Sequence, residues 1–311
     1  MGDKPRLLLT GGEGMVGRNV LAHAAAKEWK IFAPARTELD LLKSKAVEEY
    51  IALTKPDCVI HAAGRVGGIH ANIANPVAFL DDNALMGRNV VMSAWKGGVR
   101  NLINLASTCI YPRDAENPLR EDSILTGPLE PTNEGYALAK ILVMRLCEFI
   151  RYEDQGAQYK TLIPCNLYGL YDNFDPEKSH LVPAIINKVH YARKSGAKRI
   201  EIWGDGTARR EFMFAGDLAD AIWNALKDIS NLPNVMNIGV GLDYSVNEYY
   251  ATIADIIGWK GKFIHDLTKP TGMKQKLCAV EKQTAWGWKP STTLEEGIAQ
   301  TYEYYLENIK A

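Results

Sequence analysis

Short apolar runs alternate with longer helical patterns through the first half of the chain. The apolar runs lack a clean alternation with polar residues, as expected for strands that are covered on both faces of a sheet. These runs span residues 6–10, 29–33, 57–63, 101–107 and 161–165. The helical patterns between them span residues 15–27, 43–53, 76–96 and 135–152. This order predicts an α/β protein built on a doubly wound parallel sheet of the Rossmann type.

The pattern becomes irregular after about residue 166. Later helices are expected at 181–194, 217–226, 249–258 and 294–307, and a short strand at 200–203. Residues 1–165 are therefore predicted to form the Rossmann domain, to which the chain returns at about 212–240. Residues 166–211 and 241–311 are predicted to form a smaller, interleaved α/β domain for a substrate. Ligands are expected in the crevice beyond the carboxyl ends of the strands.

A glycine-rich loop follows the first predicted strand and opens the first predicted helix. Gly11, Gly14 and Gly17 form a G-x-x-G-x-x-G pattern, with Met15 and Val16 between the last two glycines. Glycines at these positions allow a tight turn and let backbone N–H groups approach a pyrophosphate at a helix N-terminus. The loop therefore predicts a dinucleotide site.

The end of the second predicted strand indicates which dinucleotide binds. An acidic residue there accepts the 2′-hydroxyl of NAD, whereas an arginine accommodates the 2′-phosphate of NADP. The chain has Arg36 and no acid before Glu38, so NADP(H) is the predicted cofactor of residues 1–165. The expected further contacts are Asp40 and Leu41 at the adenine, and Ala62, Ala63 and Gly64, whose small size lets the backbone approach the cofactor.

A Y-x-x-x-K motif lies inside the helical pattern at 135–152. The spacing of Tyr136 and Lys140 puts the phenol and the ammonium on one helix face. A tyrosine has a reference pKa of about 10, and a nearby positive charge favours the phenolate and lowers that pKa. Ser107, at the end of the fourth predicted strand, can donate to the same substrate oxygen. With the dinucleotide loop upstream, these three residues predict a carbonyl reductase site.

Two further residues suggest chemistry beyond hydride transfer. Cys109 follows Ser107 by two positions, and His180 lies outside the Rossmann domain. A carbon beside a ketone can lose a proton because the resulting charge spreads onto the ketone oxygen. A thiolate base and a histidine acid on opposite sides of a sugar can therefore invert such carbons. A buried thiol and a helix-cap histidine are the alternatives that these residues leave open.

The overall charge and the cysteines narrow the possible partners and the compartment. The formal net charge is −1, which gives no case for a nucleic-acid or membrane partner. No apolar run approaches the roughly 18–20 residues of a membrane helix, and the first residues do not predict a secretory signal. The five cysteines are scattered without a C-x-x-C pair, which indicates reduced thiols in the cytoplasm and neither structural zinc nor another metal site.

Several stretches, loops included, resemble the GDP-L-fucose synthase family of the extended short-chain dehydrogenase/reductase superfamily. They are VGGI at 66–69, STCIYP at 107–112, LEPTNE at 129–134, NLYG at 166–169, DNF at 172–174, SH at 179–180 and REF at 210–212. The similarity covers nearly the whole chain. It implies that GDP-4-keto-6-deoxy-D-mannose is epimerised at C-3 and C-5 and then reduced at C-4 with NADPH.

The resemblance also implies a role for individual residues. Tyr136 would donate the proton during reduction, Lys140 would tune it and hold the nicotinamide ribose, and Ser107 would orient the ketone. Cys109 matches the family's epimerisation base and His180 its acid. Positions near the nicotinamide are Asn166, Leu167 and His180, and those near GDP are Lys188, Trp203 and Arg210. The family is homodimeric, usually through helices like those at 76–96 and 135–152.

The chain departs from the family pattern at three places. Glu13 stands in the glycine loop where a basic residue is common, Lys188 replaces an arginine, and Ala279 replaces an acid. These departures leave open the exact sugar, such as a colitose precursor or a 6-deoxy-heptose. C-4 reduction without epimerisation is a further alternative, against which Cys109 and His180 argue. A dehydratase would need an Asp-Glu pair where Thr108 and Cys109 stand, and an NAD-dependent 4-epimerase would prefer an acid in place of Arg36. A non-catalytic, redox-sensing Rossmann protein would have little need for the Ser, Tyr and Lys together.

Overall fold

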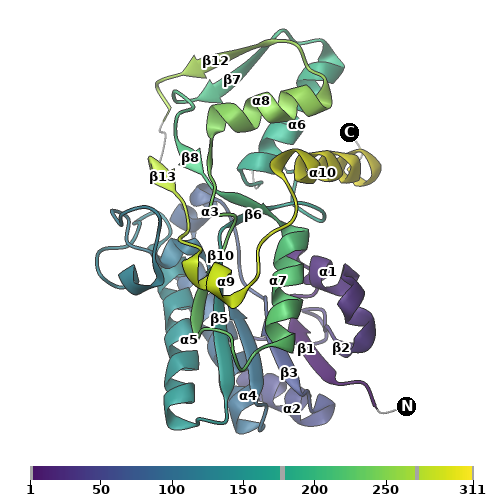
Figure 1. Cartoon of the computed structure of the whole chain (residues 1–311), viewed down its shortest axis with the longest axis vertical. Coiled ribbons are helices and arrows are strands. Elements are labelled where there is room, and N and C mark those ends of the chain that lie inside the picture. Colours follow the sequence, from purple (N-terminus) through teal and green to yellow (C-terminus); the bar gives the residue numbers. More distant parts are fainter. Residues whose placement is uncertain (1–2, 176–178, 270–272, 310–311) are drawn as a thin grey trace.

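A six-stranded parallel sheet forms the base of the molecule in the computed structural model, which describes residues 3–175, 179–269 and 273–309. Its strand order is β10-β5-β4-β3-β1-β2 (Figure 1). The strands are β1 (Arg6–Thr10), β2 (Lys30–Phe32), β3 (Cys58–His61), β4 (Asn101–Leu105), β5 (Gln158–Pro164) and β10 (Val235–Ile238). Every neighbouring pair in this sheet is parallel, which confirms the predicted Rossmann architecture.

Helices cover both faces of this sheet, and β1 shows why its strands are apolar throughout. Leu7 and Leu9 belong to one hydrophobic cluster and Leu8 to another, because successive side chains of a strand point to opposite faces. The first cluster includes residues of α1 (Met15–Ala22) and α7 (Ala215–Lys227). The second cluster includes residues of α2 (Ser44–Thr54), α4 (Pro76–Lys96) and α5 (Glu134–Glu153).

A smaller lobe lies beyond the carboxyl ends of the main strands (Figure 1). Its hydrophobic cluster joins three helices and two parallel strands. These are α6 (Leu181–Ser195), α8 (Val246–Ile257), α10 (Leu294–Asn308), β7 (Arg199–Trp203) and β12 (Lys262–Asp266). Two small sheets connect the lobes. They contain β11 (Tyr244–Ser245), β8 (Arg209–Arg210) and β13 (Gln275–Lys276), and β6 (Asn166–Tyr168) paired with β9 (Phe212–Phe214).

The short connecting elements complete the chain. They are α3 (Ile69–Ala74), α9 (Glu281–Trp286) and the 3-10 turns η1 (Ala24–Glu28), η2 (Thr108–Ile110) and η3 (Glu121–Ser123). None of the helices within the described part of the chain is both long and apolar enough to cross a membrane. All five cysteines are buried and unpaired.

The structure differs from the sequence expectations at element boundaries. The helix expected at 15–27 ends at Ala22, because His23 adopts an extended conformation and its imidazole accepts a hydrogen bond from the N–H of Ala25, which starts η1. The sixth strand, β10, was not anticipated, although it lies within the predicted return of the chain at 212–240. The exact domain boundaries stay a prediction.

Candidate active site

The glycine-rich loop turns the chain sharply between β1 and α1. Gly11 has a φ of +76°, in the left-handed region that favours glycine. A Cβ there would lie 2.7 Å from the backbone nitrogen of Ala63, and a Cβ on Gly17 would overlap the carbonyl oxygen of Gly11. The N–H of Gly14 donates to that same carbonyl at 3.1 Å. These close approaches hold the loop against the end of β3, with the N-terminus of α1 at the wall of a cavity.

A cavity of about 1040 Å³ lies at the carboxyl ends of the strands, between the two lobes. Typical small-molecule sites measure roughly 300–1,000 Å³, so this one has room for a dinucleotide. Each residue predicted to contact the cofactor lines it: Gly11, Gly14, Met15, Val16, Gly17, Arg36, Asp40, Leu41, Ala62, Ala63, Gly64, Ser107, Tyr136, Lys140, Asn166, Leu167 and His180. The residues present therefore fit a dinucleotide.

Two opposite charges line the cavity near the glycine loop and the end of β2. Arg36 and Glu13 are both exposed, and neither side chain makes a hydrogen bond or ion pair with another residue in the described ranges. The Arg36 guanidinium is thus free to bind a 2′-phosphate, as the sequence predicts. The Glu13 carboxylate would oppose that binding by charge repulsion.

Ser107, Tyr136 and Lys140 meet in this cavity from two elements. Ser107 follows β4 and precedes η2, whereas Tyr136 lies in the first turn of α5 with Lys140 one turn later. The Lys140 ammonium donates to the carbonyl oxygen of Leu105 at 2.9 Å and lies 5.6 Å from the centre of the Tyr136 ring. Burial lowers the pKa of Lys140 to about 8, so the ammonium is still mostly protonated at pH 7.

The protonation of Tyr136 differs from the sequence expectation. Burial raises the pKa of the phenol, and the nearby Cys109 raises it further, whereas the sequence argument expected Lys140 to lower it. The reason is that loss of solvent penalises the phenolate more than a lysine lying over the ring face compensates. Tyr136 is therefore a protonated phenol at neutral pH, which is the state that can donate a proton.

Cys109 and His180 line the same cavity from opposite lobes. Cys109 is buried on η2, and its thiol contacts the carbonyl oxygen of Ser107 at 3.9 Å. His180 occupies the N-cap position of α6, and its side chain makes no hydrogen bond to the helix. Burial raises the pKa of the Cys109 thiol. Partial loss of solvent lowers the pKa of the His180 imidazole, although this residue stays exposed at the cavity, so both groups are neutral at pH 7. The structure thus brings together all five residues predicted to be catalytic.

The three residues predicted to contact GDP lie outside the cavity lining. Trp203 is 56% exposed at the end of β7, where its indole N–H donates to Glu201 and Lys269 stacks on its ring. Lys188 on α6 donates to the backbone oxygen of the same Glu201. Arg210 on β8 donates to the carbonyl of Arg209 at 2.7 Å. Lys188 and Trp203 therefore share Glu201 as a partner.

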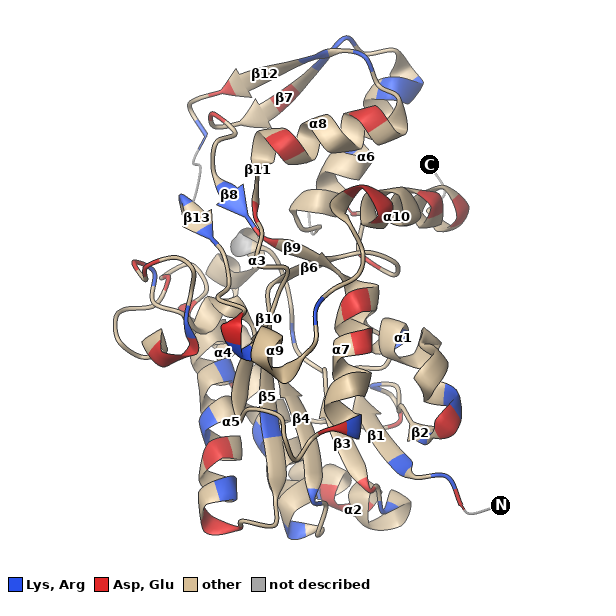
Figure 2. Cartoon of the chain, viewed as in Figure 1, with Lys and Arg blue, Asp and Glu red and all other residues tan. Residues whose placement is uncertain are grey.

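Sequence reasoning missed several ionisable residues in the cavity, such as Arg65 and Asp82, and above all Lys276. It comes from β13, a strand of two residues that pairs with β8 more than sixty positions away. Lys and Arg residues occur on both of these strands, where the lobes join (Figure 2). No local pattern around residue 276 could have predicted this placement. The nearby Ala279 is buried and does not line the cavity.

A Rossmann sheet whose cavity joins a glycine-rich loop to a serine and a Tyr-x-x-x-Lys pair defines an enzyme of the short-chain dehydrogenase/reductase type. More narrowly, the chain belongs to the NAD dependent epimerase/dehydratase family, which matches residues 7–239.

Similar proteins of known name are found among curated sequences and solved structures. A GDP-L-fucose synthase from Azorhizobium caulinodans is 55% identical and a GDP-L-colitose synthase from Yersinia pseudotuberculosis is 51% identical. The alignments cover 98% of this chain and 98% of the first protein, and 97% of this chain and 98% of the second. The structure of a GDP-mannoheptose C4 reductase from Campylobacter jejuni with NADP bound superposes with a TM-score of 0.90 at 29% identity, over 98% of this chain and 99% of that one.

Proposed function

We propose that this protein epimerises carbons beside the C-4 ketone of a GDP-4-keto-6-deoxy sugar and then reduces the ketone with NADPH. The substrate is GDP-4-keto-6-deoxy-D-mannose and the product is GDP-L-fucose. The observation that carries this proposal is that a single cavity joins Cys109 and His180 to Ser107, Tyr136 and Lys140. The first pair has the chemistry of epimerisation and the other three that of reduction. The relative at 55% identity is named for this activity.

NADP(H) is the cofactor and, when bound, supplies a hydride to the sugar carbon. Arg36 offers a cation for the 2′-phosphate, and the loop from Gly11 to Gly17 offers backbone N–H groups for the pyrophosphate. The Lys140 ammonium would bind the nicotinamide ribose. The similar C. jejuni reductase holds NADP.

Reduction uses the protonated phenol of Tyr136. Ser107 and Tyr136 donate hydrogen bonds to the C-4 oxygen and so orient the ketone. During reduction the Tyr136 proton would move to that oxygen and leave a phenolate, which the nearby Lys140 ammonium would stabilise. These residues thus convert a ketone into an alcohol without releasing a free alkoxide.

Epimerisation uses Cys109 and His180 before reduction takes place. Because both groups are neutral at rest, the reaction starts from the form in which Cys109 has lost its proton and His180 has gained one. The Cys109 thiolate removes a proton from a carbon beside the ketone, and the electron pair moves onto the C-4 oxygen. Ser107 and Tyr136 stabilise the resulting enolate through their hydrogen bonds. Protonated His180 returns a proton to the opposite face of the same carbon, which inverts it. The two lobes contribute one residue each to this pair, so the sugar lies between them.

We place the GDP moiety in the smaller lobe, against Lys188, Trp203 and Arg210. Two cations and an exposed indole suit a diphosphate and a purine base. On this proposal residues 1–165 and 212–240 bind the cofactor, and residues 166–211 and 241–311 bind the sugar nucleotide.

A second candidate is the same chemistry on a 3-deoxy sugar, with inversion at C-5 alone. It is favoured by the 51% identity to a GDP-L-colitose synthase. Both candidates are tested by incubating the protein with each keto sugar in deuterated water, with and without NADPH, and analysing the products by NMR. We expect deuterium uptake before reduction and GDP-L-fucose as the product from the 6-deoxy-mannose derivative. Reduction of both sugars without deuterium uptake would contradict the epimerase activity.

We further propose that the protein is a homodimer formed through α4 and α5. Leu138, Leu142 and Phe149 are exposed and recur at helical spacing on α5, and Val77 is exposed in the first turn of α4. Apolar patches of this kind mark interfaces. Phe149→Glu is expected to convert the dimer to a monomer in sedimentation velocity, whereas Leu53→Glu, on the exposed side of α2, is expected to leave it intact. Identical sedimentation of both variants as dimers would contradict this interface.

We place the protein in the cytoplasm. Five buried thiols without a disulfide suit a reducing compartment.

A further inference from the structure

The two-residue strand β13 brings Lys276 into the catalytic cavity. β13 pairs in parallel with β8, where the N–H of Glu211 donates to the Lys276 carbonyl at 3.2 Å. On its other side, the N–H of Leu119 donates to the carbonyl of Leu277 at 2.7 Å. Backbone hydrogen bonds from two different segments therefore fix this strand.

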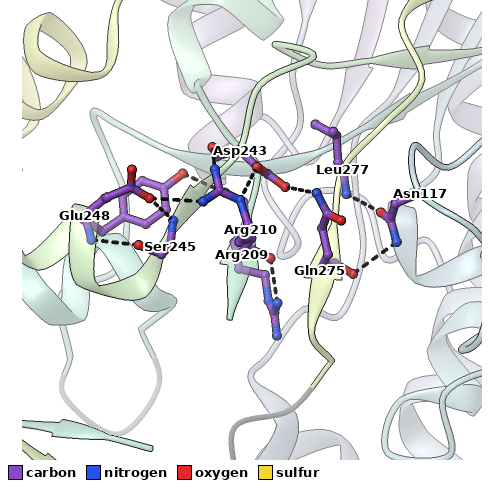
Figure 3. Close-up of polar contacts among 9 residues, drawn as sticks. Asn117, Arg209, Arg210, Asp243, Ser245, Glu248, Gln275 and Leu277 are labelled. Atoms are coloured by element: carbon purple, nitrogen blue, oxygen red, sulfur yellow. Dashed lines mark hydrogen bonds and ion pairs between the residues drawn. The ribbon is translucent and has the colours of Figure 1, made fainter. Parts of the chain in front are cut away.

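A polar network sets the direction of the side chains on β13 (Figure 3). The Gln275 amide donates to the Asp243 carboxylate at 2.6 Å, and that carboxylate also accepts from Arg209 at 2.7 Å. Asp243 is only 5% exposed, so this anchor is shielded from solvent. Successive side chains of a strand point in opposite directions. With Gln275 held by Asp243, Lys276 points the other way, into the cavity.

The Lys276 ammonium has no partner of its own. Within residues 3–175, 179–269 and 273–309 it makes no hydrogen bond and no ion pair. Cys109 lines the same cavity, and the positive charge of Lys276 is the strongest influence that opposes the rise in the pKa of that thiol on burial. Burial lowers the pKa of Lys276, and the thiol partly opposes that fall. Lysine and thiol are therefore electrostatic neighbours.

We propose that Lys276 is a positioning residue that acts through Cys109, with its ammonium stabilising the thiolate that serves as the epimerisation base. This proposal depends on the proposed function only in taking Cys109 as that base. When the sulfur takes a proton from the sugar carbon, the electron pair stays on the sugar and Lys276 keeps its own proton. The other charged or ionisable groups that act on Lys276 or Cys109 are Lys140 on α5, Arg210 on β8, Glu130 before α5, and Cys278.

The pH dependence of thiol alkylation tests this pairing without any sugar or nucleotide. The full-length protein is treated with iodoacetamide at several pH values, and modification of Cys109 is followed by peptide mass spectrometry. Lys276→Gln is expected to raise the pH at which alkylation of Cys109 is half-maximal by about one unit. Below that pH, alkylation should then be about tenfold slower than in the native protein. Lys276→Arg keeps the charge and is expected to retain a profile close to that of the native protein.

Control variants separate this role from others. Lys274→Gln removes an exposed charge two positions away and is expected to leave the profile unchanged. Lys276→Met, whose apolar chain can occupy the same space, serves as a second variant should the glutamine disturb folding. The proposal would be overturned if the pH profile of Cys109 alkylation were unchanged in both Lys276→Gln and Lys276→Met. A raised KM for the GDP sugar as their only defect would assign Lys276 to substrate binding. Because alkylation needs no substrate, this test can fail or succeed independently of the test of the proposed reaction.

Discussion

Tyr136→Phe is expected to lower NADPH-dependent reduction of the keto sugar by about 10²–10⁴-fold. The phenol is the group that would donate the proton to the C-4 oxygen, and burial keeps it protonated at neutral pH. Phenylalanine preserves the ring and its edge contact with Phe79, so the fold should be retained. Steady-state kinetics with NADPH measures the loss, with kcat expected to fall more than KM rises because the phenol acts mainly in the transition state.

A matched control lies on the same helix. Tyr152→Phe removes a phenol that is 86% exposed at the far end of α5 and is expected to leave turnover unchanged. Deuterium exchange should also slow in Tyr136→Phe, because the enolate loses one of its two hydrogen-bond donors. Native turnover in Tyr136→Phe would remove Tyr136 as the proton donor, and with it the mechanism of reduction proposed above.

Local signals in the sequence were sufficient for five of the six strands of the main sheet, all but β10, and for most of the cavity. The glycine loop, Arg36 and the Tyr-x-x-x-Lys motif are each short patterns whose geometry follows from one strand or one helix. Parallel topology then brings the carboxyl ends of β1, β3 and β4 to one edge, so residues that follow these strands line one cavity. The apolar strands were recognisable because both faces of the sheet are covered.

The parts that the sequence did not reveal depend on long-range pairing. β13 has two residues and exists because β8 and the segment at Leu119 supply its hydrogen bonds. The residues around Lys276 in the sequence therefore do not predict that it lies near Cys109. The rise in the pKa of Tyr136 is likewise a consequence of burial, which the spacing of Tyr136 and Lys140 along a helix does not report. The sequence predicted that the Lys140 charge lies near Tyr136, but it did not predict the burial that raises the pKa of the phenol.

Cys109→Ser is expected to slow solvent deuterium uptake into the keto sugar by about 10²–10⁴-fold while the ketone is still reduced. A serine hydroxyl ionises far less readily than a thiol, so the base is weakened, but Ser107, Tyr136 and Lys140 are untouched. Reduction then competes with a slowed inversion. NMR of the products in deuterated water should show reduced sugars in which one or both carbons beside C-4 carry no deuterium. These carbons should also lack the inverted configuration found in the product of the native enzyme.

Cys165→Ser is the matched control for this substitution, because Cys165 is a second buried thiol that lines the same cavity. Burial and the neighbouring Glu211 carboxylate hold the pKa of Cys165 well above its ordinary value, so this thiol is a poor base. Cys165→Ser should therefore exchange deuterium at the native rate. Native exchange in Cys109→Ser together with loss of exchange in Cys165→Ser would move the base from η2 to the end of β5. Exchange at the native rate in both variants would exclude both thiols as the base and leave His180 as the residue to test next.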